Sequence, residues 1–294
     1  MLSIFTKMHF MKFLTILSVV PVFMSCSDLP QQITEKAKLS LKEVSGLEYI
    51  PSSGLWAVED SGNENTLYNI DEKGKIRNAY TVKNVKNTDW EDLASDAEGN
   101  IYIGDFGNND NERKDLAIYK VSAGRYDSVV AKTEFYYPEQ KAFPPKKSEW
   151  IYDAESFFES NGIFYIFTKN RSKGFDGSFN VYTIPNKPGR HAAQLVTTLE
   201  SCGNYRKCAI TGADISPDGT KAVLLSGDKI WLLTGFGTGD FTKVAMQQFP
   251  LGHFSQKEGI TFKDNDTLLI ADEKDKGEGG KLYEVKLSDL KSKI

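Results

Sequence analysis

Residues 211–219 read Thr-Gly-Ala-Asp-Ile-Ser-Pro-Asp-Gly, and an apolar run at residues 222–225 follows them. A small polar start, a mixed apolar stretch and a Pro-Asp-Gly turn are typical of two strands joined as a hairpin, because Asp and Gly tolerate the backbone angles of tight turns. The same order of features occurs five times along the chain. Such a repeat indicates the fold more strongly than any single segment does.

Each repeat unit contains the same series of strand-like runs. The polar starts lie at residues 45–48, 90–93, 153–156, 211–214 and 258–261. Second runs follow at residues 55–58, 101–103, 163–167, 222–225 and 268–271. Third runs lie at residues 67–70, 117–121, 181–184, 230–233 and 282–285. Fourth runs follow the first four units only, at residues 79–82, 133–137, 194–198 and 244–249.

Units of four strands predict an all-β fold, a five-bladed β-propeller. The fifth unit lacks a fourth run, whereas an unassigned strand-like run at residues 37–41 precedes the first unit. We expect this N-terminal strand to complete the last blade and close the ring. Six blades are the alternative count. A two-sheet sandwich is a further alternative, but it does not explain why only the last unit lacks a fourth strand.

Composition places the chain among ordinary globular proteins. Hydrophobic residues make up 40% and charged residues 26% of the 294 positions, which excludes disorder, collagen and coiled coil. Removal of residues 1–25 would take away Lys7 and Lys12 and no acid, and would change the net charge from −4 to −6. An acidic chain without a basic block is not expected to bind nucleic acid, because phosphate neutralisation supplies most of that affinity.

The N-terminus has the pattern of an export signal. Residues 13–24 are apolar apart from Thr15 and Ser18, and Lys12 precedes them. This run is too short for a transmembrane helix, which needs ~20 residues. A short apolar segment behind a positive charge is typical of a secretory signal. We therefore expect residues 1–25 to direct export.

The end of this segment resembles the cleavage site of a bacterial lipoprotein. Small Ser25 precedes Cys26, the predicted lipidation site, although Phe23 stands where that family usually has leucine. An ordinary cleaved signal and an uncleaved anchor are the alternatives. Polar residues 26–36 would then form a tether, and residues 37–294 the propeller domain. The expected location is the cell envelope, periplasmic or surface-exposed, with a lipid anchor as the only membrane contact.

Two cysteines remain after this segment, Cys202 and Cys208. An oxidising compartment permits a disulfide between them, which would close a small loop. Zinc is not expected, because no second pair of cysteines or histidines accompanies them.

Alignment of the units places one polar residue of each at a common level of the central channel. The residues are Ser45, Glu91, Glu155, Thr211 and Glu258. Carboxylates held close together either become protonated or share a cation. Oxygen ligands without histidine or thiolate favour a hard ion, and a flexible ring suits calcium better than magnesium. The sequence therefore predicts a calcium site, with a water-filled channel and solvated glutamates as the alternative.

The order hydroxyl, Glu, Glu, hydroxyl, Glu resembles that of the calcium-activated nucleotidase (apyrase) family, five-bladed propellers with a central calcium. Short motifs at residues 59–62 and 104–107 lie where that family has related ones. Secreted bacterial propellers of the phytase-like esterase group are also similar. They share the Ser-Gly-Leu start, the Trp-Glu-Asp motif within residues 89–92 and the segment 211–219. The resemblance covers residues 40–290 as a pattern and implies a calcium-dependent hydrolase.

The ends of the second strands return to the level of this ring and form a polar rim. The rim residues are Glu59, Asp60, Asp105, Asn108, Asn109, Lys169, Arg171, Asp228, Asp272 and Glu273. The candidate ligand-binding residues among them are Asp60, Asp105, Lys169, Arg171 and Asp272. The nucleotidase family has a pair of arginines where this chain has Lys169 and Arg171. These two cations would meet a phosphate or carboxylate, or else only balance the acidic rim.

Two functions follow from these features. His191 and His253 have no serine or cysteine elbow motif beside them, so triad catalysis is not expected. The first hypothesis is a lipid-anchored, monomeric propeller with a central calcium, whose rim binds a polar or anionic ligand or a protein partner. The alternative is a calcium-dependent phosphoester or phosphoanhydride hydrolase, nucleotidase-like or phytase-like.

Overall fold

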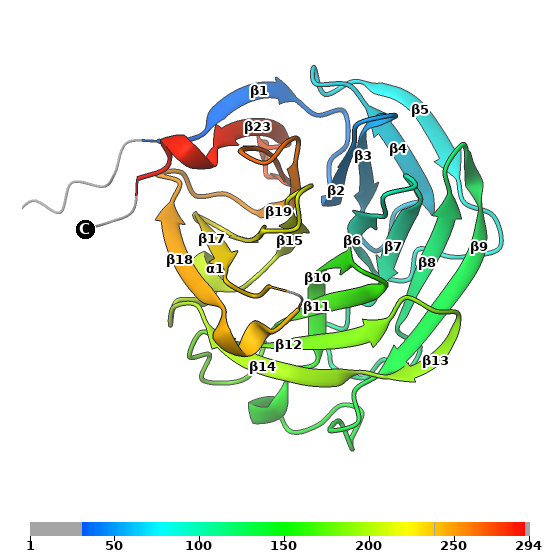
Figure 1. Cartoon of the computed structure of the whole chain (residues 1–294), viewed down its shortest axis with the longest axis vertical. Coiled ribbons are helices and arrows are strands. Elements are labelled where there is room, and N and C mark those ends of the chain that lie inside the picture. Colours follow the sequence, from blue (N-terminus) through cyan, green and yellow to red (C-terminus); the bar gives the residue numbers. More distant parts are fainter. Residues whose placement is uncertain (1–30, 238, 292–294) are drawn as a thin grey trace, which may run out of the picture.

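The computed structural model describes residues 31–237 and 239–291. It shows sheets arranged in a ring around a central axis (Figure 1). The predicted signal segment, residues 1–25, and the predicted lipidation site Cys26 lie outside the described residues. Within the described ranges, no helix is both long and apolar enough to cross a membrane.

Five antiparallel sheets form the blades, which confirms the predicted five-bladed propeller. The first blade contains β2 (Val44–Ile50), β3 (Gly54–Glu59), β4 (Thr66–Ile70) and β5 (Ile76–Thr81). The second contains β6 (Trp90–Ser95), β7 (Ile101–Asp105), β8 (Ala117–Ser122) and β9 (Arg125–Tyr136). The third contains β10 (Asp153–Ser160), β11 (Ile163–Lys169), β12 (Ser178–Pro185) and β14 (Gln194–Glu200).

The last two blades differ in how they are completed. The fourth contains β15 (Gly212–Ile215), β16 (Lys221–Ser226), β17 (Lys229–Thr234) and β18 (Ala245–Pro250). The fifth contains β19 (Lys257–Phe262), β20 (Thr267–Asp272) and β23 (Lys281–Lys286), and its outer strand is β1 (Thr34–Lys38). The N-terminal strand therefore closes the ring, as the missing fourth run of the last unit predicted.

Smaller elements lie outside these blades or at their edges. They are β13 (Gly189–Ala192), the hairpin β21 (Lys274–Asp275) and β22 (Glu278–Gly279), α1 (Tyr205–Cys208), and the 3-10 turns η1 (Lys147–Glu149), η2 (Phe241–Lys243) and η3 (Leu287–Asp289). Strand β13 belongs in sequence to the third blade, yet it pairs in parallel with β9 of the second.

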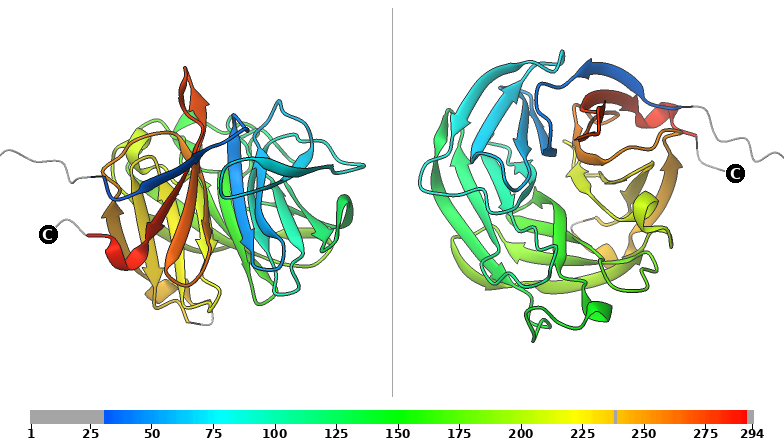
Figure 2. Two further views of the ribbon diagram at one scale, coloured as in Figure 1. Left: turned by 90° about the horizontal axis from the view of Figure 1, so that it is seen from above. Right: turned by 180° about the vertical axis from the view of Figure 1, so that it is seen from behind.

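The closing strand begins three residues before the predicted run at residues 37–41. Thr34 pairs with Glu284 and Lys38 with Lys281, and Figure 2 shows this closure between the blue and red ends of the chain. Leu41 lies instead in the core between the fifth and first blades, where the chain crosses to β2. The apolar residues at positions 39 and 41 belong to this crossover, and the strand uses residues expected in the tether.

The hydrophobic core lies between neighbouring blades. Trp56 of β3 and Trp90 of β6 are almost fully buried in one cluster that joins the first two blades. Ile33, just ahead of β1, is 4% exposed and packs in a cluster with Phe249 and Tyr283 of the last two blades. Burial of these apolar faces drives the blades together.

We expect Ile33→Ala to lower the free energy of unfolding by about 2–4 kcal/mol, because it removes buried contacts at the ring closure. Ile76→Ala is the matched control, since Ile76 lies on the outer strand β5 and is 41% exposed. Chemical denaturation of both variants measures the difference. Equal losses in the two variants would show that the segment preceding β1 does not contribute to closure.

Candidate functional site

One polar side chain lies at the start of the first strand of each blade, where the regular pairing with the second strand is interrupted or has not yet begun. The pairing with the second strand skips one residue in four blades, at Ser45, Glu91, Glu155 and Glu258. Thr211 stands just ahead of β15, and its N–H donates to the carbonyl of Leu225 at 3.0 Å. A bulge bends a strand locally and redirects its side chain. The five predicted ring residues thus occupy equivalent positions in the five blades.

The two hydroxyl members connect neighbouring blades. Ser45 Oγ donates to the carbonyl of Trp90 at 2.8 Å. Thr211 Oγ1 donates to the carbonyl of Lys257 at 2.6 Å. Each hydroxyl therefore donates its hydrogen bond to the inner strand of the next blade. Its oxygen lone pairs are what it could offer to an ion.

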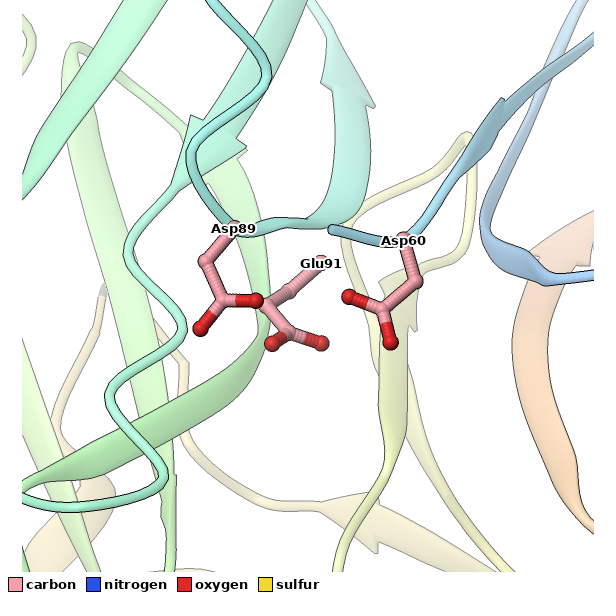
Figure 3. A group of neighbouring side chains, drawn as sticks. All are labelled: Asp60, Asp89 and Glu91. Atoms are coloured by element: carbon pink, nitrogen blue, oxygen red, sulfur yellow. The ribbon is translucent and has the colours of Figure 1, made fainter. Parts of the chain in front are cut away.

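Three carboxylates converge at the junction of the first two blades. Asp60 follows β3, Asp89 precedes β6, and Glu91 is the bulged residue of β6. One carboxylate oxygen of each lies within 4.8 Å of the others, and Figure 3 shows the three side chains pointing toward one another. We refer to Asp60, Asp89 and Glu91 as the carboxylate trio.

Hydrogen bonds to the backbone hold the trio in place. Asn87 Nδ2 donates to the carbonyls of Glu59 and Asp60 at 2.8 and 3.0 Å, and Asn87 Oδ1 accepts from the N–H of Trp90 at 3.0 Å. One amide side chain thereby joins the end of β3 to the start of β6. The second strand contributes as well, because Asp105 Oδ1 accepts from the N–H of Asp89 at 3.2 Å.

The predicted rim residue Asp105 therefore contacts the backbone of the trio residue Asp89. It is 1% exposed, and Arg113 Nη2 donates to its Oδ1 at 2.9 Å. Arg113 also donates to the carbonyl of Gly107 at 2.8 Å. A Cβ at Gly107 would overlap Glu91 Oε1 and Asp89 Oδ2, so a larger residue would displace these two carboxylates. The Gly-Asp-Phe-Gly loop thus leaves space for two of the three carboxylates.

Burial and mutual repulsion disfavour the charged forms of the trio. Glu91 is 6% exposed, and Asp60 and Asp89 are among the charges that raise its pKa. Burial, and then the charge of Glu155, raises the pKa of Glu91 well above its usual range. Burial, and then the charge of Asp60, raises the pKa of Asp89 to about 6. Burial also raises the pKa of Asp60. A bound cation would relieve all three shifts.

The neighbouring part of the ring is already neutralised by basic residues. Lys169 Nζ lies 2.5 Å from Glu155 Oε2, and Arg171 contacts Glu155 Oε1 and Asp153 Oδ2. Burial alone would raise the pKa of Glu155, but the two cations reverse this effect and lower it. Lys169 and Arg171 thus balance the acidic ring, which was one of the two interpretations of this pair.

A cavity of about 660 Å³ opens at the same end of the channel, and we call it the mouth cavity. Its lining includes five predicted residues, namely Lys169, Arg171, Thr211, Glu258 and Glu273. Burial raises the pKa of Glu258 well above its usual range, and Glu155 adds to the shift. The ion-paired residues and the trio border one another, since Glu155 also affects the pKa of Asp60 and Asp89.

Asp272 does not line the mouth cavity. It is fully buried within the fifth blade, where it accepts hydrogen bonds from the N–H of Lys281 at 2.8 Å and from the Tyr283 hydroxyl at 2.9 Å. Its neighbour Glu273 lines the cavity instead. Burial, followed by the charge of Asp60, raises the pKa of Glu273 to about 7. Side chains alternate between faces along a strand, so one position decides which carboxylate reaches the site.

The disulfide loop forms part of the cavity wall. Cys202 and Cys208 are joined, with Cα atoms 5.4 Å apart, and the loop between them carries α1. Tyr205 of this helix accepts a hydrogen bond from Arg171 Nη1 at 3.0 Å. The disulfide therefore closes the loop that carries Tyr205, the hydrogen-bond acceptor of Arg171 Nη1.

Three residues of the site were absent from the sequence-based list. Asp89 belongs to the trio, Asp153 holds Arg171, and Lys257 is fully buried beside the cavity. Lys257 Nζ donates to the carbonyls of Gly227 and His253 at 3.1 and 3.0 Å, and burial lowers its pKa to about 8. A sequence pattern could have identified Asp89 and Asp153, because each stands two positions before a ring glutamate.

No protein-family model matches the chain, and no curated protein matches it. Among solved structures it is similar to the PQQ-bound aldose sugar dehydrogenase of Streptomyces coelicolor, at 11% identity and a TM-score of 0.48, over 86% of this chain and 96% of that chain. It is also similar to a gluconolactonase of Xanthomonas campestris, at 12% identity and a TM-score of 0.48, over 90% of this chain and 96% of that chain. For virginiamycin B lyase of Staphylococcus aureus, the identity is 15% and the TM-score 0.40, over 83% of this chain and 66% of that chain. Likenesses at this level carry no information about chemistry.

The raised pKa of Asp89 predicts how stability depends on pH when no metal is bound. Protonated Asp89 stabilises the folded state at low pH, and this contribution is lost as the pH rises from the ordinary value of 3.8 through about 6. In the presence of a chelator at about pH 7.5, we expect Asp89→Asn to raise the free energy of unfolding by about 1–3 kcal/mol.

Thermal and chemical unfolding with a chelator, at about pH 4 and about pH 7.5, measure this difference. Asp110→Asn is the control, because Asp110 is an exposed carboxylate in the loop next to the site. A lower stability of Asp89→Asn than of the wild type at the higher pH would contradict the expectation.

Proposed function

We propose that this propeller binds a calcium ion at the carboxylate trio and a polar or anionic ligand, small or on a protein partner, at the adjacent mouth cavity. The observation that carries the proposal is the convergence of three carboxylates at a part of the ring that makes no ion pair with Lys169 or Arg171 among the described residues.

The residues of the trio fit a hard divalent cation. They offer only carboxylate oxygens, which calcium prefers, and its variable coordination number tolerates ligands from different loops. Glu91 is buried, and Gly107 approaches its carboxylate closely because it has no side chain. Of the predicted ring, Glu91 would be a direct ligand. Glu155 would not be one, because its oxygens are engaged by Lys169 and Arg171.

The mouth cavity suits a ligand with negative charge. Lys169 and Arg171 both line it, and the guanidinium has more N–H donors than its three contacts use. Aromatic Tyr205 and Phe254 are further lining residues, 37% and 43% exposed. A carboxylate or phosphate would reach the basic edge while an apolar part of the ligand contacts the rings.

The envelope location belongs to the same proposal. We infer a lipid anchor at Cys26, a cell-envelope location and a monomeric state from the sequence, and the disulfide between Cys202 and Cys208 is compatible with an oxidising compartment.

A calcium-dependent phosphoester or phosphoanhydride hydrolase is the second candidate. Calcium would polarise the phosphoryl group. A carboxylate of the trio that calcium leaves free would accept a proton from an attacking water. Arg171 would hold the anionic substrate. The resemblance to calcium-activated nucleotidases and phytase-like esterases supports this candidate.

Calcium should stabilise the folded protein through mass action. At free calcium about 100 times its Kd, the free energy of unfolding should rise by about 2.7 kcal/mol. Glu91→Gln and Asp60→Asn should abolish this increase, whereas the exposed control Asp110→Asn should retain it. Thermal unfolding with calcium or chelator, together with elemental analysis, provides the test. An unchanged melting temperature and no bound metal in the wild type would refute the site.

Arg171→Lys tests the ligand and separates the two functions. It keeps the positive charge beside Asp153 and Glu155 but loses the forked geometry. We expect phosphate or pyrophosphate to bind about tenfold more weakly to this variant. Arg206→Lys, an exposed position on the same cavity, should bind as the wild type does.

Activity on nucleotides, phytate and simple esters should be measured with and without calcium for the wild type, Arg171→Lys and Glu91→Gln. The binding proposal expects no turnover by any of the three proteins. Calcium-dependent turnover that both variants lose would establish the hydrolase instead.

A further inference from the structure

A second cavity, of about 690 Å³, lies at the opposite end of the channel from the carboxylate trio. Its lining comes from the turns between the first and second strands of all five blades, at residues 48–52, 94–99, 158–161, 214–219 and 262–263. We call it the turn-side cavity. Because every inner strand runs from the mouth to these turns, the two cavities share no lining residue.

The turn-side cavity is strongly acidic. Its lining contains six carboxyl groups, Glu48, Asp96, Glu98, Glu159, Asp214 and Asp218. Lys263 is the one basic residue among the lining residues, and its Nζ is paired with Glu72 at 2.7 Å, whereas Asp96 is paired with Lys120 at 3.0 Å. A concave surface with this balance attracts cations.

Glu48 is the feature that points to a ligand. Its side chain lines the cavity, although the residue is only 6% exposed. Its Oε1 accepts a hydrogen bond from Ser95 Oγ at 2.5 Å, but its Oε2 is buried and has no hydrogen-bond partner among the described residues. A buried acceptor without a donor destabilises the folded state, and more strongly when it is charged. Burial, and then the charge of Asp214, raises the pKa of Glu48 well above its usual range.

The neighbouring carboxylates cannot complete a metal site with Glu48. Asp214 accepts from the N–H groups of Ile215 and Phe262 at 2.7 and 2.6 Å, so both of its oxygens are engaged. Among the described residues, the metal-competent group of carboxylates is the trio at the other end of the channel. Calcium needs about six to eight oxygen ligands. One free carboxylate oxygen suits a hydrogen-bond donor better than an ion.

The rest of the lining favours an organic cation. Apolar side chains alternate with the acids around the cavity, at Ile50, Pro51, Phe158, Ile215, Pro217 and Phe262. The volume is also far larger than a single ion requires. An alkyl body would contact these side chains while an ammonium group faces Glu48.

We propose that the turn-side cavity binds a small alkylammonium ligand, a primary amine or polyamine, whose ammonium group pairs with the Glu48 carboxylate. The bound ammonium supplies the missing counter-charge. This site is independent of the calcium proposal, because it involves neither the trio nor the mouth cavity.

Isothermal titration of the purified protein with spermidine tests the proposal. We expect one spermidine per chain, with affinity reduced about tenfold or more by Glu48→Gln, because a charge-assisted hydrogen bond is lost. Ala97→Arg should weaken binding similarly. Ala97 lines the cavity on an exposed turn, so the added cation repels the ligand without disturbing the core. Glu91→Gln, at the other end of the channel, should bind spermidine as the wild type does.

Thermal unfolding checks that each variant is folded, and Ala97→Arg decides the matter if Glu48→Gln is not. Several results would overturn the proposal: no binding of spermidine to the wild type, binding that Glu48→Gln and Ala97→Arg leave unchanged, or binding that only Glu91→Gln abolishes. Binding of calcium alone that Glu48→Gln removes would replace the amine with a metal ion.

Discussion

Antiparallel pairing between β1 and β23 joins the two ends of the described chain in one sheet. Because of this pairing, five inner strands are held around one axis, and residues more than two hundred positions apart meet on neighbouring inner strands, as Tyr49 and Thr261 do. The carboxylates of the ring would otherwise separate, since like charges that are removed from water repel strongly. Closure of the ring is therefore what allows the protein to concentrate negative charge at its centre.

The structure handles this charge differently on neighbouring blades. On the third blade, Lys169 and Arg171 lie against Glu155, and no further cation is needed there. Between the first and second blades, no ion pair to the carboxylate trio occurs among the described residues, and the pKa values of the trio are raised. A buried charge that lacks a partner is costly to a fold. The asymmetry between these two parts of the ring is the main reason to assign function to the trio.

Repetition made the fold predictable, because each unit shows its strands and turns again. The same alignment predicted the equivalent positions of the ring residues, and four of the five are bulged residues. Details that depend on a single position were not predictable. Asp272 and Glu273 are adjacent, and only strand register shows which one lines the cavity. The ion pairs of Glu155 and the free oxygen of Glu48 depend on side-chain geometry, which a sequence pattern does not contain.

Strand β13 has a consequence for how the ring comes apart. The chain leaves the third blade after β12, adds β13 to the edge of β9, and returns to the third blade as β14. Thr133 Oγ1 strengthens this crossing through a hydrogen bond to the carbonyl of Lys187 at 3.0 Å. Neither blade can release its outer edge while the other remains intact. The second and third blades should therefore exchange their amide protons as one cooperative unit, and any gradual opening of the ring has to begin elsewhere.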